Sequence, residues 1–273
     1  MSSRRRVLTV AALLLSAACA APAAKAGRPT NPTTPGTGTT SSSTASSSPG
    51  PTVRVVGLGD SVMAGTNCDC AGLAEEYGTA LQARDGGHVD VTNLGEGGKV
   101  TEDLLEDLQV DVPTRTAIAG ADVVLVTIGA NDLLPQLDQW RSSGCDESCF
   151  AGPAAQMGQN LRQILTVIDA IRDGHHGTVL VTDYWNVFTD GDVARNSGGQ
   201  AQLDWSDDVT AAANQQICAA ASASGDTCVD LVPVFKPGGS DPTSLLADDG
   251  DHPNAAGVQA TVQALLAHTP TQP

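Results

Sequence analysis

Ser61, Asp249 and His252 have the residue types that acyl-transfer chemistry requires. Ser61 stands in the triplet Gly-Asp-Ser, and His252 stands directly before a proline near the C-terminus. A serine hydroxyl is a weak nucleophile until a base takes its proton, and histidine is suited to that task near neutral pH. A carboxylate must also orient the imidazole and stabilise its charged form. Asp248, Asp249 and Asp251 all lie beside His252 in sequence.

Two further segments offer hydrogen-bond donors for an oxyanion. Asn131, in a Gly-Ala-Asn-Asp segment, carries a side-chain amide that can donate, and the segment Asn93–Gly98 (NLGEGG) is rich in glycine. Each segment alone is weak evidence for an active site, because Gly-Asp-Ser is common and Gly-Ala-Asn-Asp also suits a turn or a helix cap. Because all of these segments occur in one chain and in this order, their joint occurrence by chance is improbable.

Alternating strand and helix patterns predict an α/β fold that positions these residues. Apolar, β-branched runs predict strands at Thr52–Gly59, Val89–Leu94, Ala121–Ile128, Thr178–Tyr184 and Cys228–Phe235. Helical spacing predicts helices at Leu73–Arg84, Thr101–Leu108, Pro153–Arg172, Asp207–Ser222 and Asn254–His268. Such alternation is typical of a parallel sheet covered by helices on both faces, a three-layer α/β/α sandwich. Working residues gather at the C-terminal ends of such strands, and the segments with Ser61, Gly98 and Asn131 follow the first three.

With these residues in place, the chain resembles the SGNH hydrolases, also called the GDSL lipase/esterase family. The family is named for Ser, Gly, Asn and His in four blocks, and matches here are Ser61, a glycine after Asn93, Asn131 and His252. The resemblance covers essentially all of residues 53–268. The first block reads GDSV instead of GDSL, a change at an apolar position. The resemblance implies a flavodoxin-like, five-stranded parallel sheet in the order 2-1-3-4-5.

The resemblance also implies roles for individual residues. Ser61 would be the nucleophile, His252 the base and Asp249 the acid of a triad. Counting five residues on from Asn93 selects Gly98, so the implied oxyanion donors are the N–H groups of Ser61 and Gly98 and the amide of Asn131. Gly95 and Gly97 would then form turns, and Asp60 and Asp132 would hold loops or cap helices.

The implied activity is that of a serine esterase or acylhydrolase working through an acyl-serine intermediate. A competing hypothesis is a non-catalytic cell-envelope module that keeps the fold to bind a glycan or a protein partner. The four intact blocks favour the enzyme. The ester substrate, a small molecule, a lipid or a glycan, stays open, because function depends on the site more than on the fold. No phosphate-binding glycine loop or HExxH pattern is present, so we expect no cofactor and no metal.

Three tryptophans have two equally weighted interpretations. Trp140 follows the Asn131 segment, Trp185 follows the fourth strand, and Trp205 ends a glycine-rich stretch from Asn186 that we expect to be a loop. They would either line the substrate pocket or pack in the core.

Charge is distributed unevenly along the chain, which has a formal net charge of −17. Residues 1–51 contain five basic and no acidic residues, so the remainder carries nine basic and 31 acidic residues, a net charge of −22. Phosphate backbones and anionic lipid surfaces would repel such a body, so nucleic-acid binding is not expected. We expect a monomer that meets the membrane only through a lipid anchor, if at all.

The N-terminus predicts export. Residues 1–26 combine Arg4–Arg6 with an apolar run too short to span a bilayer, as in a signal peptide. The segment ending at Cys19 resembles a lipobox, whose cysteine is lipidated, while Ala24-Lys25-Ala26 offers ordinary cleavage. Sec and twin-arginine export both fit. Residues 27–52 form a Ser/Thr/Pro/Gly-rich linker, followed by the hydrolase domain at 53–273, so we expect secretion or display on the outer membrane face.

Apart from Cys19, six cysteines remain, an even number typical of disulfides in an exported chain. Nearness in sequence favours pairing of Cys145 with Cys149 and of Cys218 with Cys228, which leaves Cys68 with Cys70. Zinc binding is the alternative, although no zinc-type spacing accompanies the cysteines.

Overall fold

The computed structural model describes residues 52–175 and 177–271. The predicted signal peptide, the lipidation of Cys19 and residues 27–51 of the linker lie outside this part of the chain. Among the described helices, none combines the length and the apolar character that a membrane span requires.

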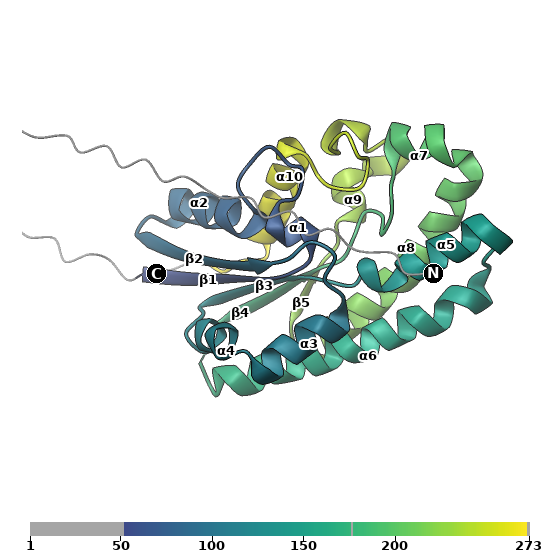
Figure 1. Ribbon diagram of the computed structural model, residues 1–273. Helices are drawn as coiled ribbons and strands as arrows, with labels where there is room; N and C mark the ends of the chain where they lie inside the picture. Colours follow the sequence, from purple (N-terminus) through teal and green to yellow (C-terminus); the bar gives the residue numbers. More distant parts are fainter. Residues whose placement is uncertain (1–51, 176, 272–273) are drawn as a thin grey trace, which may run out of the picture. The chain divides into compact units, whose positions relative to one another are not determined.

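A single parallel sheet forms the centre of the described domain (Figure 1). Its strand order, β2-β1-β3-β4-β5, is the order that the resemblance implies. All five residues of β3 are buried, as expected for a strand flanked on both sides and covered on both faces. The strands are β1 (Thr52–Gly59), β2 (His88–Gly95), β3 (Val123–Thr127), β4 (Thr178–Thr182) and β5 (Thr227–Val229).

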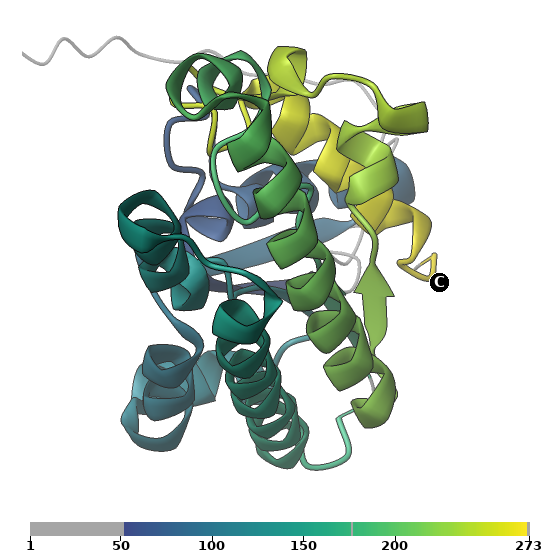
Figure 2. The ribbon, with the colours of Figure 1, turned by 90° about the vertical axis from the view of Figure 1, so that its right-hand side faces the viewer.

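Helices cover both faces of this sheet, so the predicted three-layer sandwich is confirmed (Figure 1). One layer contains α2 (Leu73–Asp85) and α10 (Ala255–Ala267), which pack against each other. In the opposite layer α6 and α8 lie side by side (Figure 2). The helices of that layer are α3 (Thr101–Val110), α4 (Val112–Ala119), α6 (Glu147–Arg172) and α8 (Gly199–Ser224).

The prediction of a strand over Cys228–Phe235 is wrong beyond its first two residues. The strand ends at Val229, and α9 (Val232–Phe235) follows. The Asp230 carboxylate accepts a hydrogen bond of 3.0 Å from the Val232 N–H, which turns the chain out of the sheet. Pro233 then occupies the first helical turn, where its missing N–H costs nothing.

The predicted loop from Asn186 to Ser206 is also wrong, because α7 (Gly191–Ser197) and the first two turns of α8 occupy most of it. Asp190 starts α7 by accepting the Gly191 N–H at 2.7 Å. The long helix α6 likewise begins six residues before the expected start, where Asp146 accepts the Ser148 N–H at 3.0 Å. Side-chain caps therefore begin α6 and α7 despite the glycines and proline nearby.

Three disulfides join the cysteines in the predicted pairs. Their Cα–Cα distances are 5.2 Å for Cys68–Cys70, 5.5 Å for Cys145–Cys149 and 5.1 Å for Cys218–Cys228. The zinc alternative for these six cysteines is therefore not supported, since paired sulfurs do not offer thiolates. All three bonds close short segments of the chain, so each stiffens a local turn.

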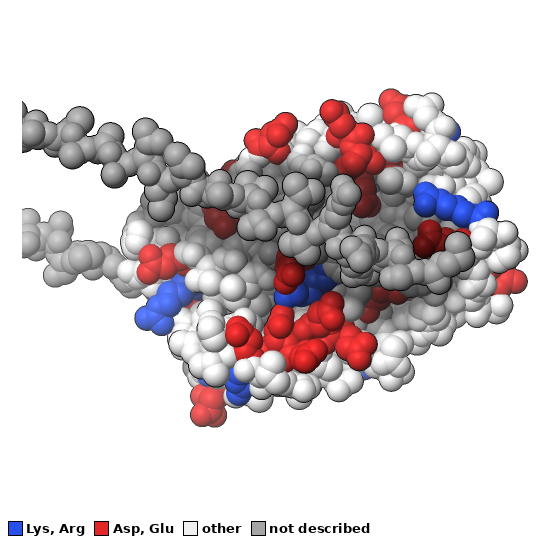
Figure 3. All heavy atoms as spheres, in the orientation of Figure 1, with Lys and Arg blue, Asp and Glu red and all other residues white. Residues whose placement is uncertain are grey.

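Acidic side chains outnumber basic ones on the visible face of the domain, as the sequence count requires (Figure 3). One group of acidic residues surrounds Lys99, which bonds to Asp107 at 2.5 Å and to Glu96 at 3.1 Å. This ammonium partly offsets the negative charge beside the loop that contains Gly98.

Candidate active site

The segment after β1 turns sharply to present Ser61 at the start of α1 (Ser61–Ala64). Gly59 has φ +139°, and a Cβ there would lie 1.8 Å from the Thr127 carbonyl oxygen, so a side chain does not fit. Asp60 follows in an extended conformation, and its carboxylate caps α1 by accepting the Val62 N–H at 3.0 Å. The close approach of β1 to β3 and this cap together fix where the Ser61 side chain begins.

Ser61 and His252 line one small cavity of about 50 Å³ at the carboxyl ends of the strands. Asn131 lines the same cavity, so three of the four family blocks meet here. The other lining residues come from α1, from the segment after β3, from the segment after β4 and from the His252 loop: Asp60, Val62, Ala130, Leu134, Tyr184, Trp185, Asn186, Val187 and Asp251.

The imidazole of His252 is hydrogen-bonded to Asp249. His252 Nδ1 lies 2.7 Å from Asp249 Oδ2. The other carboxylate oxygen of Asp249 accepts the backbone N–H groups of Asp251 at 2.9 Å and His252 at 3.0 Å. This arrangement fixes the orientation of the imidazole and leaves Nε2 as the ring nitrogen not engaged by Asp249.

Hydrogen bonds keep Asp249 ionised beside the imidazole. Partial burial acts to raise the pKa of Asp249, but donors from the His252 N–H, the Asn67 amide and the Asp251 N–H outweigh it and hold that pKa well below its usual range. Asn67 Nδ2 donates at 2.6 Å to Oδ2, the same oxygen that is paired with His252. Sequence reasoning missed Asn67, because nothing in the sequence links it to a residue 182 positions away.

Asp60 directly precedes Ser61, and its carboxylate connects the ends of β1, β3 and β4. It is buried, and its carboxylate accepts hydrogen bonds from the Tyr184 hydroxyl and, at 3.3 Å, from Thr127 Oγ1. Burial raises the pKa of Asp60 to about 6, although these donors and the Val62 N–H act to lower it. The sequence-based expectation that Asp60 holds a loop and caps a helix is confirmed. Tyr184 as its partner was missed.

The segment after β4, which forms one wall of the cavity, is bound to α8 by polar side chains at four-residue spacing. Asn214 accepts the Tyr184 N–H at 3.1 Å and donates to the Tyr184 carbonyl at 2.7 Å. Thr210 Oγ1 accepts the Val187 N–H at 3.1 Å, and Ser206 Oγ accepts from the Asn186 amide at 3.0 Å. This wall is therefore held rigidly.

The loop that contains Asp249 and His252 rests on a buried ion pair. Asp190 donates its N–H to the Gly250 carbonyl at 2.7 Å. The Asp190 carboxylate lies 2.7 Å from Lys236 Nζ, with side chains that are 4% and 15% exposed. The ion pair thus fixes Asp190, whose backbone N–H holds the loop at Gly250.

Asn131 and Gly98 belong to neighbouring segments, but only Asn131 lines the Ser61 cavity. Asn131 Nδ2 donates at 3.0 Å to the carbonyl of Lys99, the residue after Gly98. Gly98, with φ +82°, lines an adjoining hollow together with Glu96, Gly97 and Lys99. Asp132 accepts the Thr101 N–H at 3.0 Å, so it holds the start of α3 as expected.

Of the three tryptophans, Trp185 lines the cavity and is buried. Its ring stacks on Phe235 with centroids 4.1 Å apart. Trp140, from α5 (Leu134–Ser143), and Trp205 stack on each other at 5.5 Å and do not belong to the cavity lining. Trp205 also stacks on Phe188 at 5.3 Å. The rings of Trp140 and Trp205 therefore contribute to packing.

One group of potential metal ligands occurs among the described residues. Asp183, Cys218 and Cys228 offer ligand atoms within 4.8 Å of one another. The two sulfurs are joined in a disulfide, so this group does not provide the thiolates that a metal site of this kind requires.

Comparison with known families agrees with this geometry. The model of the GDSL-like Lipase/Acylhydrolase family matches residues 58–260, and the chain belongs to that family. It is therefore a hydrolase that acts on esters, with a small-molecule ester as substrate. A search of curated proteins found no match.

Solved structures with the same fold include several ester hydrolases. The lipase Lip_vut3 from a goat rumen metagenome superposes with a TM-score of 0.67 at 21% identity, covering 79% of this chain and 96% of that one. A lipase/acylhydrolase from Enterococcus faecalis gives a TM-score of 0.54 at 20% identity and coverages of 81% and 99%. The acetyl xylan esterase AlAXEase gives 0.53 at 19% identity and coverages of 79% and 99%. At these identities the likeness establishes the fold.

Proposed function

We propose that this protein is an exported serine esterase that cleaves carboxylic esters through an acyl-Ser61 intermediate. The observation that carries the proposal is the shared cavity of Ser61 and His252, with His252 Nδ1 bonded to Asp249 at 2.7 Å. In this mechanism Nε2 of His252 takes the Ser61 proton while Oγ attacks the ester carbonyl carbon. The alcohol leaves with that proton, and water then hydrolyses the acyl-serine by the same steps in reverse order.

The oxyanion formed at each step needs preorganised donors. In the described part of the chain, the backbone N–H groups of Ser61 and Gly98 donate no hydrogen bond. The Asn131 amide uses one N–H on Lys99 and retains a second. We assign these three groups to the oxyanion. The assignment of Gly98 is supported by the residue after it, Lys99, whose carbonyl accepts a hydrogen bond from the Asn131 amide.

The size of the cavity favours a short acyl group. It is about 50 Å³ in volume, and the buried Trp185 forms part of its lining. By the same measure about 10–15 Å³ is enough for one water molecule, so such a space suits a group of a few heavy atoms. A series of p-nitrophenyl esters from acetyl to palmitoyl tests this assignment. The highest kcat/KM should fall at acetyl to butyryl, and a maximum at the long chains would contradict it.

Export is supported by two independent features. The first 26 residues have the pattern of a signal peptide, and three disulfides in the domain suit an oxidising compartment. Fractionation of cells that express the wild type and Cys19→Ala tests the location. Loss of membrane association in the variant supports a lipid anchor. Equal release of both proteins to the medium supports ordinary cleavage, and retention of both in the cytosol contradicts export.

Hydrolysis of p-nitrophenyl acetate by the wild type and Ser61→Ala tests the enzyme directly. The variant should lose at least 1,000-fold in kcat, which corresponds to about 4 kcal/mol of barrier. Thr66→Ala, in the turn after α1 and outside the cavity lining, controls for general disturbance of this segment. Equal rates for wild type and Ser61→Ala would contradict the proposal.

A further inference from the structure

The short loop between α1 and α2 contacts the acid of the triad from outside the Ser61 cavity. Asn67 lies six positions after Ser61, and its amide donates to Asp249 Oδ2 at 2.6 Å. Asn67 does not belong to the Ser61 cavity lining; it lines a separate cleft on the other side of Asp249 with Asp69 and Asp248. Asp249 is thus held between His252 on the cavity side and Asn67 on the cleft side.

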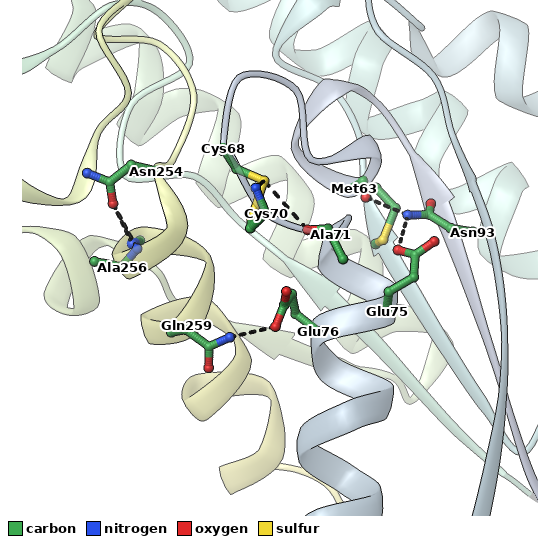
Figure 4. Close-up of a disulfide and its surroundings, with 11 residues drawn as sticks. Met63, Cys68, Cys70, Ala71, Glu75, Glu76, Asn93, Asn254, Ala256 and Gln259 are labelled. Atoms are coloured by element: carbon green, nitrogen blue, oxygen red, sulfur yellow. Dashed lines mark hydrogen bonds between the residues drawn. A yellow bond between two sulfur atoms is a disulfide. The ribbon is translucent and has the colours of Figure 1, made fainter.

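Two contacts restrict the conformation of the loop that carries Asn67. At its base, Gly65 approaches Gly72 so closely that a Cβ on Gly65 would lie 2.7 Å from the Gly72 Cα. At its tip, the Cys68–Cys70 disulfide directly follows Asn67 (Figure 4). Asn67 itself has φ +58°, a left-handed conformation that asparagine tolerates better than most residues. Such a loop loses little further entropy when it holds the amide against Asp249.

The base of this loop is also bonded to the neighbouring strand. Asn93 Nδ2 donates to the Met63 carbonyl at 2.9 Å and to Glu75 at 2.7 Å (Figure 4). These contacts connect the end of α1, the start of α2 and β2. The Asn67 amide is therefore placed by the same elements that place the nucleophile.

We propose that Asn67 is a positioning residue that fixes the carboxylate of Asp249 for the imidazole of His252, and that the Cys68–Cys70 disulfide holds Asn67 in place. This inference rests on the proposed serine-esterase function. The amide shares one carboxylate oxygen with the imidazole, so it restricts rotation of that carboxylate and keeps Oδ2 directed at Nδ1. A group in this position acts on the rate of reaction more than on substrate binding, because it lies outside the cavity.

Asn67→Gly is the direct test, because glycine keeps the left-handed backbone and removes only the amide. The expected result is a fall of about tenfold in kcat on p-nitrophenyl acetate, with KM within about twofold of the wild type. Asp69→Gly is the matched control: Asp69 lies in the same loop, is also left-handed with φ +53°, and makes no hydrogen bond to Asp249. It should keep kcat within about twofold of the wild type.

Asn67→Asp provides a second variant that also tolerates the left-handed backbone. It replaces the donor with a carboxylate beside Asp249, so at pH 8 its kcat should fall further than that of Asn67→Gly. Wild-type kcat in both Asn67 variants would overturn the inference. Inactivity of the wild-type enzyme itself would instead overturn the proposed function, so the two failures are distinguishable.

A cycle with Cys68→Ser/Cys70→Ser tests the part assigned to the disulfide. This double variant should lower kcat several-fold in the wild-type background and little further in the Asn67→Gly background. Cys145→Ser/Cys149→Ser, which opens a similarly short disulfide elsewhere, should give equal effects in both backgrounds. Independent, multiplicative losses from Asn67→Gly and the Cys68/Cys70 change would overturn the role of the disulfide.

Discussion

The hydroxyl of Tyr184 donates a hydrogen bond to the carboxylate of Asp60, the residue directly before Ser61. Tyr184 begins the wall of the cavity, and Asn214 holds its backbone through both the N–H and the carbonyl. Through the Tyr184 and Asp60 side chains, which are both buried, the bond thus connects the segment held by α8 to the residue before Ser61. Positions far from the reacting atoms should therefore affect the geometry of Ser61.

Tyr184→Phe tests this connection. The change removes a buried donor from Asp60, so the free energy of unfolding should fall by about 1–3 kcal/mol in urea denaturation. Modification of Ser61 by a fluorophosphonate should also slow several-fold. Tyr77→Phe is the control, because Tyr77 makes a comparable buried hydrogen bond of 2.7 Å to Thr269 and neither residue lines the cavity. Equal labelling rates for wild type and Tyr184→Phe would contradict a positioning role.

Lys236→Met tests the ion pair beneath the His252 loop. The change leaves the buried Asp190 carboxylate unpaired, so we expect a loss of about 3–5 kcal/mol in the free energy of unfolding. Arg195→Met breaks more exposed pairs with Asp192 and Asp241 and should cost less than about 1 kcal/mol. Similar losses in the two variants would indicate that burial of Asp190 does not determine the energy of its pair.

Asp183→Asn tests the pH dependence of stability. Burial raises the pKa of the Asp183 carboxyl to about 7, although the Leu231 N–H donates to it at 2.6 Å and acts to lower it. Because the folded-state pKa lies above the unfolded one, the folded protein binds the extra proton. The stability that this proton contributes is complete below about pH 4 and is lost as the pH rises to about 7.

Asparagine stays neutral and can still accept from Leu231, so the variant should not show this loss. Relative to the wild type, its free energy of unfolding should rise by roughly 3 kcal/mol between pH 4 and pH 7. Asp230→Asn changes the same net charge at an exposed neighbour and should show little of this trend. If the difference in the free energy of unfolding between Asp183→Asn and wild type stays constant across that pH range, Asp183 is ionised throughout.

Residues that interact locally were predictable from the sequence. Asp249 and His252 lie three positions apart, so one loop brings them together, and the β-branched run at Thr52–Gly59 coincides with β1. The helix α9 was missed because its apolar residues continue those of β5 and only the Asp230 cap separates the two. The sheet order followed from the family resemblance and not from the pattern of strands.

Long-range contacts of common residue types were not predictable. Asn67 meets Asp249 and Tyr184 meets Asp60 across 182 and 124 positions, and a lone asparagine or tyrosine gives no sign of such a partner. The lining role of Trp185 and the packing role of Trp205 were likewise indistinguishable, since both residues are large and apolar and both side chains are buried. In the structure Trp185 lines the cavity, whereas Trp205 lies on α8 and stacks on Trp140 and Phe188.

The proposed mechanism requires that Ser61 becomes covalently acylated. Mass spectrometry of the protein after treatment with a fluorophosphonate, followed by peptide mapping, tests it most directly. We expect one adduct per chain, located on Ser61, absent from Ser61→Ala and formed much more slowly in His252→Ala. Active wild-type enzyme with no adduct on Ser61, or with equal labelling of Ser61→Ala at another residue, would contradict it.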